Sequence, residues 1–363
     1  MAVLVKTAAS APVRYSDPFV GRLYAEIGAL IEGDAADADR IAGELEELAV
    51  RNNPSVRDYW RRTRPGFGLP ESAFRDGSLF HFPDAVPVRA FRTGGTTGRS
   101  RGVAEYSERG LDLMHRSIIA NARRHIFGWL DRPMVIRLVP DAHAAADEMQ
   151  PYVIALLSRT FGDPATSRSI VDADGFDVPA LIGRLNRAVV EDQPVVMIGD
   201  SCAFTQLCDA LTGLGRWVLP YRSRIVDTGG FDGRSRELEV DVLRGRLAAI
   251  LGLGPECFNS VFGKTELASQ LYDGVNLPVG PKGERGKHAL DFVRPRVRNP
   301  RTWATAAAGP GVLEIADLCV LDRPYAVLTG DRAVASKHGV VIIGREAGEA
   351  ATARDKEEAC ALS

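Results

Sequence analysis

The distribution of apolar and polar residues along this chain predicts several helices and strands. In residues 105–130, Leu111, Met114 and Ile118 recur at the spacing of one helix face. The same reasoning, with Pro and Gly marking boundaries, predicts helices at 17–52 (two helices), 105–130, 151–161, 178–190 and 203–214. Short apolar runs predict strands at 134–139 and 195–198. This alternation is typical of mainly parallel sheets flanked by helices.

The pattern changes near Phe292, where short β-like runs separated by Pro, Gly and Asp replace the helical spacing. The three clearest runs are 311–316, 326–328 and 340–343. Residues 53–90, by contrast, are predicted to be rich in loops. We therefore expect an α/β fold in three parts: a large α/β domain (1–290), a small β subdomain (291–345) and a mobile tail (346–363).

Composition narrows the class of protein. The chain has 363 residues, 45% hydrophobic and 25% charged, which suits an ordinary globular protein with a large core. Its formal net charge of −2 argues against a nucleic-acid partner. No apolar run approaches the ~20 residues of a membrane span, so no membrane partner is expected. Five cysteines without C-x-x-C spacing favour a reducing, cytoplasmic location.

One loop, from Phe91 to Gly102, concentrates glycine, threonine and arginine. Glycines let backbone N–H groups turn toward a bound group without a Cβ in the way, while threonine hydroxyls and arginines add donors and charge. These are the parts needed to bind a polyphosphate. The residues expected to do so are Thr93, Gly94, Gly95, Thr96, Thr97, Gly98 and Arg99. The loop is not a Walker loop, because no Gly-Lys-Ser/Thr closes it.

The order T-G-G-T-T-G-R-x-R-G in this loop resembles the phosphate loop of adenylate-forming enzymes, usually T-S-G-T-T-G-K-x-K-G. Three later segments follow in the order that this family requires. Residues 258–266 resemble its Y-G-M-T-E element, residues 328–331 its T-G-D element, and residues 340–345 the strand and G-R pair that follow. Singly these matches are weak, but four in order form a strong joint signal.

The resemblance implies roles for individual residues. Phe262 would flank the adenine, Thr265 would contact the α-phosphate, and Glu266 would help to hold Mg²⁺, which takes hard oxygen ligands. Asp331 would accept hydrogen bonds from the ribose hydroxyls, and Arg345 would lie near ribose and phosphate. The cofactors implied are therefore ATP and Mg²⁺, bound with the acyl group by the 1–290 domain.

A finer resemblance is to the acyl-protein synthetases of bacterial bioluminescence, and it covers nearly the whole chain. It rests on three segments: 265–273 resembles T-E-L-x-S-Q-x-Y-D, 228–233 resembles T-G-G-x-x-G, and 294–302 resembles R-V-x-D-P-x-T. Gly229 and Gly230 would then form part of the wall of the adenine and acyl pocket. The family's acyl-accepting cysteine near the C-terminus would correspond to Cys360.

Several positions depart from these patterns. Arg99 and Arg101 replace the two loop lysines, which keeps charge but changes geometry. Lys264 replaces Met beside Thr265, where it is a candidate to neutralise charge at the α-phosphate. Acidic residues precede Cys360, and acidic neighbours raise the pKa of a thiol. The chain also ends soon after Arg345, so we expect it to lack the ~100-residue mobile C-terminal domain of most acyl-CoA synthetases, with its catalytic lysine.

Together these features predict an ATP-dependent ligase that converts a carboxylic acid to an acyl-AMP, releases pyrophosphate and passes the acyl group to a thiol. The thiol is left open among Cys360, a carrier-protein phosphopantetheine and coenzyme A, and a partner acyl reductase is a further candidate for receiving the group. The acid itself is not specified by the sequence.

Two alternatives remain open. Gly199-Asp200-Ser201-Cys202-Ala203 follows an apolar run and approaches the nucleophile elbow of α/β-hydrolases, for which His288 or His338 would complete a triad. A non-catalytic adenylate-binding protein is the other alternative. Separately, Asp141, His143, Asp147 and Glu148 form a metal-like cluster. We interpret that cluster as an acidic helix start, because acidic residues are favoured there.

Overall fold

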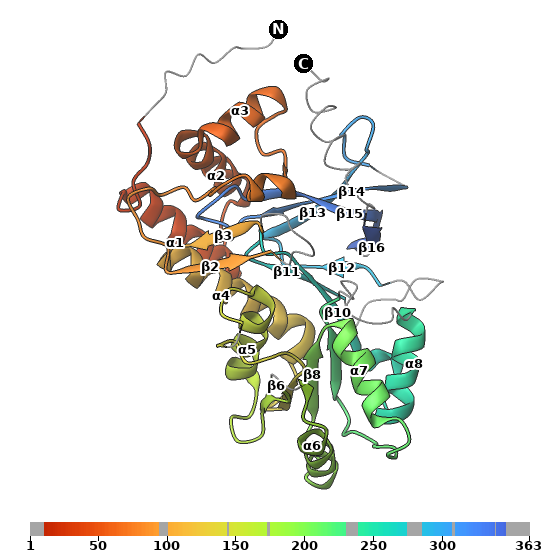
Figure 1. Ribbon diagram of the computed structural model, residues 1–363. Helices are drawn as coiled ribbons and strands as arrows, with labels where there is room; N and C mark the ends of the chain where they lie inside the picture. Colours follow the sequence, from red (N-terminus) through yellow and green to blue (C-terminus); the bar gives the residue numbers. More distant parts are fainter. Residues whose placement is uncertain are drawn as a thin grey trace.

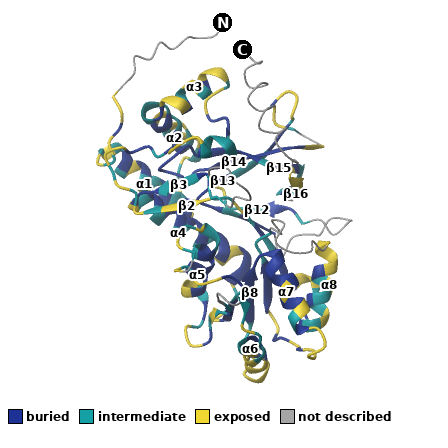
Figure 2. Ribbon diagram, in the orientation of Figure 1, coloured by how far each residue is buried: buried dark blue, intermediate teal, exposed yellow. Residues whose placement is uncertain are grey.

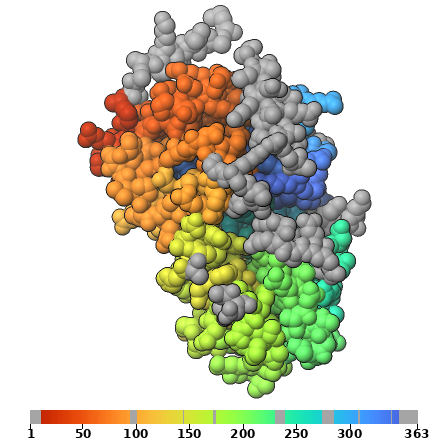
Figure 3. Space-filling model, viewed as in Figure 1, coloured from red at the N-terminus to blue at the C-terminus, as the bar shows by residue number. Residues whose placement is uncertain are grey.

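The computed structural model describes residues 11–93, 101–143, 145–172, 175–229, 239–273, 285–306, 309–337 and 339–345 (Figure 1). The predictions for Gly94–Arg99, Gly230, Cys360 and the 346–363 tail fall outside the described residues. In the space-filling view, the N-terminal helices and C-terminal strands occupy one end of the molecule, and the segments around α6, α7 and α8 occupy the other (Figure 3).

A twelve-stranded sheet runs through the molecule, in the order β13-β14-β15-β16-β12-β11-β10-β9-β8-β4-β5, with β1 paired to β15. One half is parallel and contains β4 (Met134–Arg137), β5 (Arg168–Ser169), β8 (Val195–Gly199), β9 (Arg224–Asp227) and β10 (Phe258–Gly263). Helices connect most of these strands, because parallel neighbours need a long crossover.

The other half of the sheet is antiparallel. It contains β11 (Gln270–Asp273), β12 (Lys287–His288), β13 (Val293–Arg298), β14 (Pro310–Asp317), β15 (Ala326–Ser336) and β16 (Gly339–Arg345), while β1 (Leu69–Pro70) pairs with β15 in parallel. The parallel pairing expected from the helix–strand alternation before residue 292 does not extend to β11 and β12, which pair antiparallel. The short β runs expected after Phe292 form antiparallel strands, as short connections favour. The β10–β11 pair joins the two halves, and β12 links β11 to β16 within the antiparallel half. The domain boundary at residue 290 stays a prediction.

The predicted helices are confirmed, with small shifts of most ends, but the helix expected over 105–130 is α-helical only to Ala122 and continues as the π turn Arg123–Phe127. They are α1 (Pro18–Glu32), α2 (Ala38–Asn52), α4 (Glu108–Ala122), α5 (Met149–Phe161), α6 (Val178–Val190) and α7 (Ser201–Leu211), joined by α3 (Pro54–Arg62) and α8 (Val240–Leu251). Helix α3 lies in the segment expected to be rich in loops. Asn53 caps it by accepting a hydrogen bond from the Val56 backbone, and Pro54 occupies its first turn.

Shorter elements complete the fold. They are the 3₁₀ turns η1 (Glu71–Arg75) and η3 (Pro255–Cys257), the π turn η2 (Arg123–Phe127), and the small two-stranded sheets β2 (Arg89–Arg92)/β3 (Val103–Tyr106) and β6 (Val171–Asp172)/β7 (Gly175–Phe176). Among the described residues, no helix combines the length and apolarity needed to cross a bilayer.

Alternate residues of the parallel strands divide the core into two layers. On β8, Val196 and Ile198 pack into one hydrophobic cluster with α1, α4 and α5, while Val195 and Met197 pack into a second with α6, α7 and α8. All five β8 residues are buried (Figure 2), as expected for a strand covered on both faces. The parallel half of the sheet therefore has helices on both sides.

His81 gives the fold a testable pH dependence. It is only 1% exposed, and burial, aided by the charge of Arg323, lowers its pKa to about 3. The unfolded chain takes up a proton at His81 below its ordinary pKa of 6.5, whereas the folded chain does not. This group's stabilising contribution is therefore complete above pH 6.5 and is lost, at roughly 1.4 kcal/mol per pH unit, as the pH falls toward 3.

We expect the free energy of unfolding of the parent to fall by about 2 kcal/mol more than that of His81→Gln between pH 7 and pH 5. Urea unfolding at the two pH values measures this difference. Replacing the exposed His143 with Gln is the control and should follow the parent. Equal pH dependence in His81→Gln and the parent would show that His81 is protonated in the folded state.

Candidate functional site

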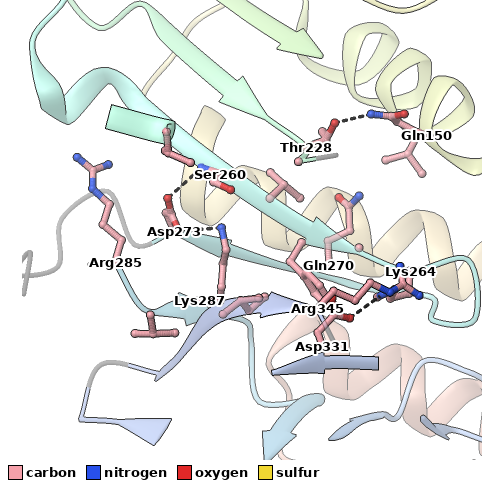
Figure 4. Close-up of a pocket in the computed structure, with 18 of the residues that line it drawn as sticks. Gln150, Thr228, Ser260, Lys264, Gln270, Asp273, Arg285, Lys287, Asp331 and Arg345 are labelled. Carbon is pink, nitrogen blue, oxygen red and sulfur yellow. Dashed lines mark hydrogen bonds and ion pairs between the residues drawn. The ribbon is translucent and has the colours of Figure 1, made fainter. Parts of the chain in front are cut away.

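A pocket of about 750 Å³ opens where the parallel and antiparallel halves of the sheet meet (Figure 4). Residues from α5, α8, β10, β11, β12, β15 and β16 line it. They include Met149, Gln150, Val153, Thr228, Gly229, Arg244, Ser260, Phe262, Lys264, Thr265, Gln270, Asp273, Arg285, Lys287, Asp331, Gly344 and Arg345. This volume lies within the range of pockets that bind small ligands.

Two neighbouring parallel strands deliver the predicted residues to this pocket. Strand β10 ends at Gly263 and is followed by Lys264 and Thr265, and β9 is followed by Thr228 and Gly229. Gly229 has φ +74°, a left-handed conformation that favours glycine. The crevice outside the carboxyl ends of parallel strands is the usual place for a ligand in such sheets.

Four charged side chains form a compact cluster at one end of the pocket, and Figure 4 shows three of them, Lys264, Asp331 and Arg345. Lys264 Nζ lies 2.7 Å from Asp331 Oδ2 and 2.9 Å from Glu71 Oε1, and Arg345 lies 2.7 Å from Glu71 Oε2. Burial alone would lower the pKa of Lys264, but Glu71 and Asp331 outweigh it and raise that pKa above its ordinary value. Likewise burial disfavours the Glu71 carboxylate, yet Lys264 and Arg345 hold its pKa below the usual range.

Glu266 lies beneath this cluster rather than on the pocket wall. The residue is only 4% exposed, and burial, followed by the like charge of Glu71, raises its pKa to about 7. Its backbone carbonyl accepts a hydrogen bond from Arg323 Nε at 3.0 Å. A buried carboxylate near a second one fits a divalent cation that takes its remaining ligands from phosphate oxygens.

A second polar cluster surrounds Asp273 at the other side of the pocket (Figure 4). Lys287 Nζ lies 2.8 Å from Asp273 Oδ1, Arg244 lies 3.5 Å from Oδ2, and the Ser260 backbone N–H donates to Oδ2 at 3.1 Å. Burial lowers the pKa of Lys287, although Asp273 partly offsets this effect. The cluster fixes the end of β11 against β10 and leaves arginine and lysine side chains on the pocket wall.

The base of the predicted phosphate loop is closed by hydrogen bonds. Thr93 N–H donates to Gly102 O at 2.9 Å, Gly102 N–H donates to Thr93 Oγ1 at 2.8 Å, and Arg101 Nε donates to Thr93 O at 2.6 Å. Arg101 also pairs with Asp147 at 3.2 Å, immediately before α5, whose first residues line the pocket. The loop therefore begins and ends on a β2–β3 hairpin tied to the segment that leads into the pocket.

The structure thus brings six predicted residues into one pocket wall: Gly229, Phe262, Lys264, Thr265, Asp331 and Arg345. Thr93 stands at the loop base and Glu266 lies below the wall. Gly94, Gly95, Thr96, Thr97, Gly98, Arg99, Gly230 and Cys360 lie outside the described residues. Sequence reasoning missed Glu71, which contacts Lys264 and Arg345 from η1. Nothing in its local sequence distinguishes Glu71 from a surface glutamate.

The nucleophile-elbow motif around Ser201 and the acidic cluster at residues 141–148 have different contacts from those that a hydrolase or a metal site would need. The Ser201 hydroxyl donates to both oxygens of Asp227, at 3.0 and 2.9 Å, and in the described part of the chain it has no histidine partner. Asp141 pairs with Arg137 and Asp147 with Arg101. No three His, Cys, Asp or Glu side chains gather as a metal site within the described residues.

No protein-family model matches the sequence, and no curated protein matches it. Among solved structures, ATP-bound MatB from Rhodopseudomonas palustris aligns with 73% of this chain and 50% of its own, with 20% identity and a TM-score of 0.50. An ATP-bound chimera of RpMatB and BxBclM (B3) gives the same values. The chain spans about half the length of these structures. The likeness confirms the predicted fold, the N-terminal domain fold of adenylate-forming enzymes.

Proposed function

We propose that this protein activates a carboxylic acid with ATP. The observation that carries the proposal is the convergence on one pocket of segments far apart in the sequence, each matching a different motif of adenylate-forming enzymes: Phe262, Lys264 and Thr265 after β10, Asp331 on β15 and Arg345 on β16. An accidental T-G-D turn has no reason to lie within ion-pair distance of Lys264, which follows β10, and Glu71 links the same lysine to Arg345 of the G-R pair. The ATP-bound state of the similar MatB structure agrees with this use of the fold.

The proposed reaction has two steps. A carboxylate oxygen of the acid attacks the α-phosphorus of ATP, the bond from that phosphorus to the bridging oxygen breaks, and pyrophosphate leaves. A thiolate then attacks the acyl carbon of the acyl-AMP, a thioester forms, and AMP leaves with the former carboxylate oxygen. The thiol is Cys360, a carrier-protein phosphopantetheine or coenzyme A, and a partner acyl reductase would use the product.

The chain's own residues would orient the nucleotide and balance its charge. Phe262 would flank the adenine and Asp331 would accept the ribose hydroxyls. Thr265 and the 93–99 loop would donate to phosphate oxygens. Glu266 would hold Mg²⁺, which supplies charge neutralisation at the phosphates when bound. Such preorganised charge is the largest contribution that a protein makes to phosphoryl transfer.

Hydroxylamine trapping tests the proposal across a panel of fatty, aryl and amino acids. Hydroxylamine converts an acyl-AMP to a hydroxamate, so the cognate acid should give an ATP-dependent hydroxamate signal above that of an ATP-free control. Nucleotide binding with no hydroxamate from any acid class would favour the non-catalytic adenylate-binding alternative.

Ser201→Ala separates the ligase from the hydrolase alternative. Since the Ser201 hydroxyl donates to the Asp227 carboxylate and has no assigned role in adenylation, its loss should change hydroxamate formation by less than about tenfold, or roughly 1.4 kcal/mol of barrier. An esterase would instead lose nearly all activity with its nucleophile. Parallel assays with ATP plus acid and with a chromogenic ester decide the matter. An ester-hydrolysis rate that disappears in Ser201→Ala would overturn the ligase assignment in favour of the hydrolase.

A further inference from the structure

The geometry points to a new role for Glu71 and a defined path for Lys264. We propose that Glu71 and Asp331 hold Lys264 at the ribose site in the nucleotide-free protein, and that ribose binding to Asp331 releases Lys264 toward the α-phosphate while Glu71 keeps it within reach. Lys264 is then the catalytic cation of adenylation and Glu71 its positioning residue. This inference rests on the proposed function.

The argument begins with the competition for Asp331. Its Oδ2 atom lies 2.7 Å from Lys264 Nζ, and the same carboxylate is the proposed acceptor of two ribose hydroxyls. The Asp331 side chain is 10% exposed and that of Lys264 is 13% exposed, so there is little room for both partners in their present positions. A bound ribose therefore displaces Lys264 from Asp331.

Glu71 remains as the second partner of Lys264, at 2.9 Å. Two further contacts hold the Glu71 carboxylate in place. The Gly330 backbone N–H donates a hydrogen bond to it, and Arg345 lies 2.7 Å from Oε2, the oxygen that does not face Lys264. Glu71 thus joins η1, β15 and β16, and it stays in place when Asp331 changes partner. A lysine released from one carboxylate and retained by the other moves over a short, defined arc.

That arc leads to the pocket in which Thr265 lies. Lys264 and Thr265 are adjacent on the pocket wall, and Thr265 is the proposed α-phosphate contact. Lys264 Nζ lies 5.4 Å from the centre of the Phe262 ring on β10, which favours a cation near the expected adenine–phosphate boundary. A lysine has a flexible four-carbon stem that allows this reorientation.

The test compares AMP with adenosine, because only AMP carries the phosphate that Lys264 would contact. Calorimetry on the full chain should show that Lys264→Met lowers the AMP-to-adenosine affinity ratio at least tenfold without weakening adenosine binding, since Asp331 becomes free for the ribose. Lys264→Arg should retain the ratio within about threefold, because it keeps the charge. The exposed Lys337→Met is the control and should match the parent.

Glu71→Gln provides the second measurement. As a positioning residue, Glu71 should affect the AMP-to-adenosine ratio, lowering it about threefold to tenfold while adenosine affinity is retained. A purely structural Glu71 would weaken both ligands equally, and that result would overturn its assignment. An unchanged ratio in Lys264→Met would overturn the role of Lys264.

The same measurements separate this inference from the proposed function. If the parent forms no acyl hydroxamate but Lys264→Met still loses the phosphate-dependent part of AMP binding, the proposed activity fails, whereas the release of Lys264 from Asp331 to the nucleotide phosphate stands. If hydroxamate forms and Lys264→Met forms it at the parental rate, the activity stands and the Lys264 assignment fails.

Discussion

Glu266→Gln should lower carboxylate-dependent pyrophosphate exchange by at least about a hundredfold, the usual cost of losing one charge-stabilising group in a transition state. Glutamine has nearly the same shape but cannot supply the anionic oxygen that Mg²⁺ requires. The fold should not suffer. Because burial already raises the pKa of Glu266 to about 7, a neutral amide removes an unfavourable charge, and the melting temperature should be equal to or above that of the parent.

Two measurements on purified Glu266→Gln check this expectation: initial exchange rates at saturating ATP and Mg²⁺, and thermal unfolding without ligand. The exposed Glu256→Gln, ten residues earlier in the chain, serves as a matched control and should keep the parental rate. An exchange rate within about tenfold of the parent, or roughly 1.4 kcal/mol of barrier, would remove Glu266 from the metal site.

The second large effect concerns Cys360. If this thiol accepts the acyl group, incubation with ATP, Mg²⁺ and the cognate acid should give a hydroxylamine-sensitive adduct on the peptide that contains it, and Cys360→Ser should give none. A serine hydroxyl is far less nucleophilic than a thiolate at neutral pH. Pyrophosphate exchange should continue in Cys360→Ser at the parental rate, since adenylation precedes acyl transfer.

Peptide mapping supplies the internal control for Cys360. Cys202, Cys208, Cys257 and Cys319 are all buried, and burial raises the pKa of the Cys208 thiol to about 11, so these cysteines should carry no adduct. If Cys360→Ser delivers acyl groups to coenzyme A or a carrier protein at the parental rate, Cys360 is not an intermediate and the external thiol attacks the acyl-AMP directly.

Local sequence signals predicted most of the helices, but not α3 or α8. Phe262, Lys264 and Thr265 were identified because residues 258–266 resemble a family motif, and Asp331 and Arg345 because their motifs follow at the expected distance downstream. What brings these two groups together is the pairing of β12 with both β11 and β16. Nothing in the local sequence of these segments indicates that they pair. The proximity of the two groups of residues could therefore be expected only from the resemblance to adenylate-forming enzymes.

The positions of Glu71 and Glu266 could not be predicted from the local sequence. Glu71 reaches the site because β1, directly before it, pairs with β15 through Leu69 and Val327, a contact between distant segments that no periodicity predicts. Glu266 was assigned from its motif, but its burial depends on the side chains packed around it. The antiparallel direction of β11 and β12 was missed for a similar reason: apolar runs predict strands, whereas the length and path of their connections determine strand direction.

Oxygen transfer from the acid to AMP is the most direct test of acid activation through an acyl-AMP. The protein is incubated with ATP, Mg²⁺, a thiol acceptor and a cognate acid labelled with ¹⁸O in its carboxylate, and the AMP is analysed by mass spectrometry. Attack of the carboxylate on the α-phosphorus predicts AMP that contains one ¹⁸O atom, in an amount equal to the thioester formed. AMP without the label would mean that water or another nucleophile attacks the α-phosphorus, and unlabelled ADP would mean attack at the γ-phosphorus, as in formation of an acyl phosphate. Either result would contradict the account.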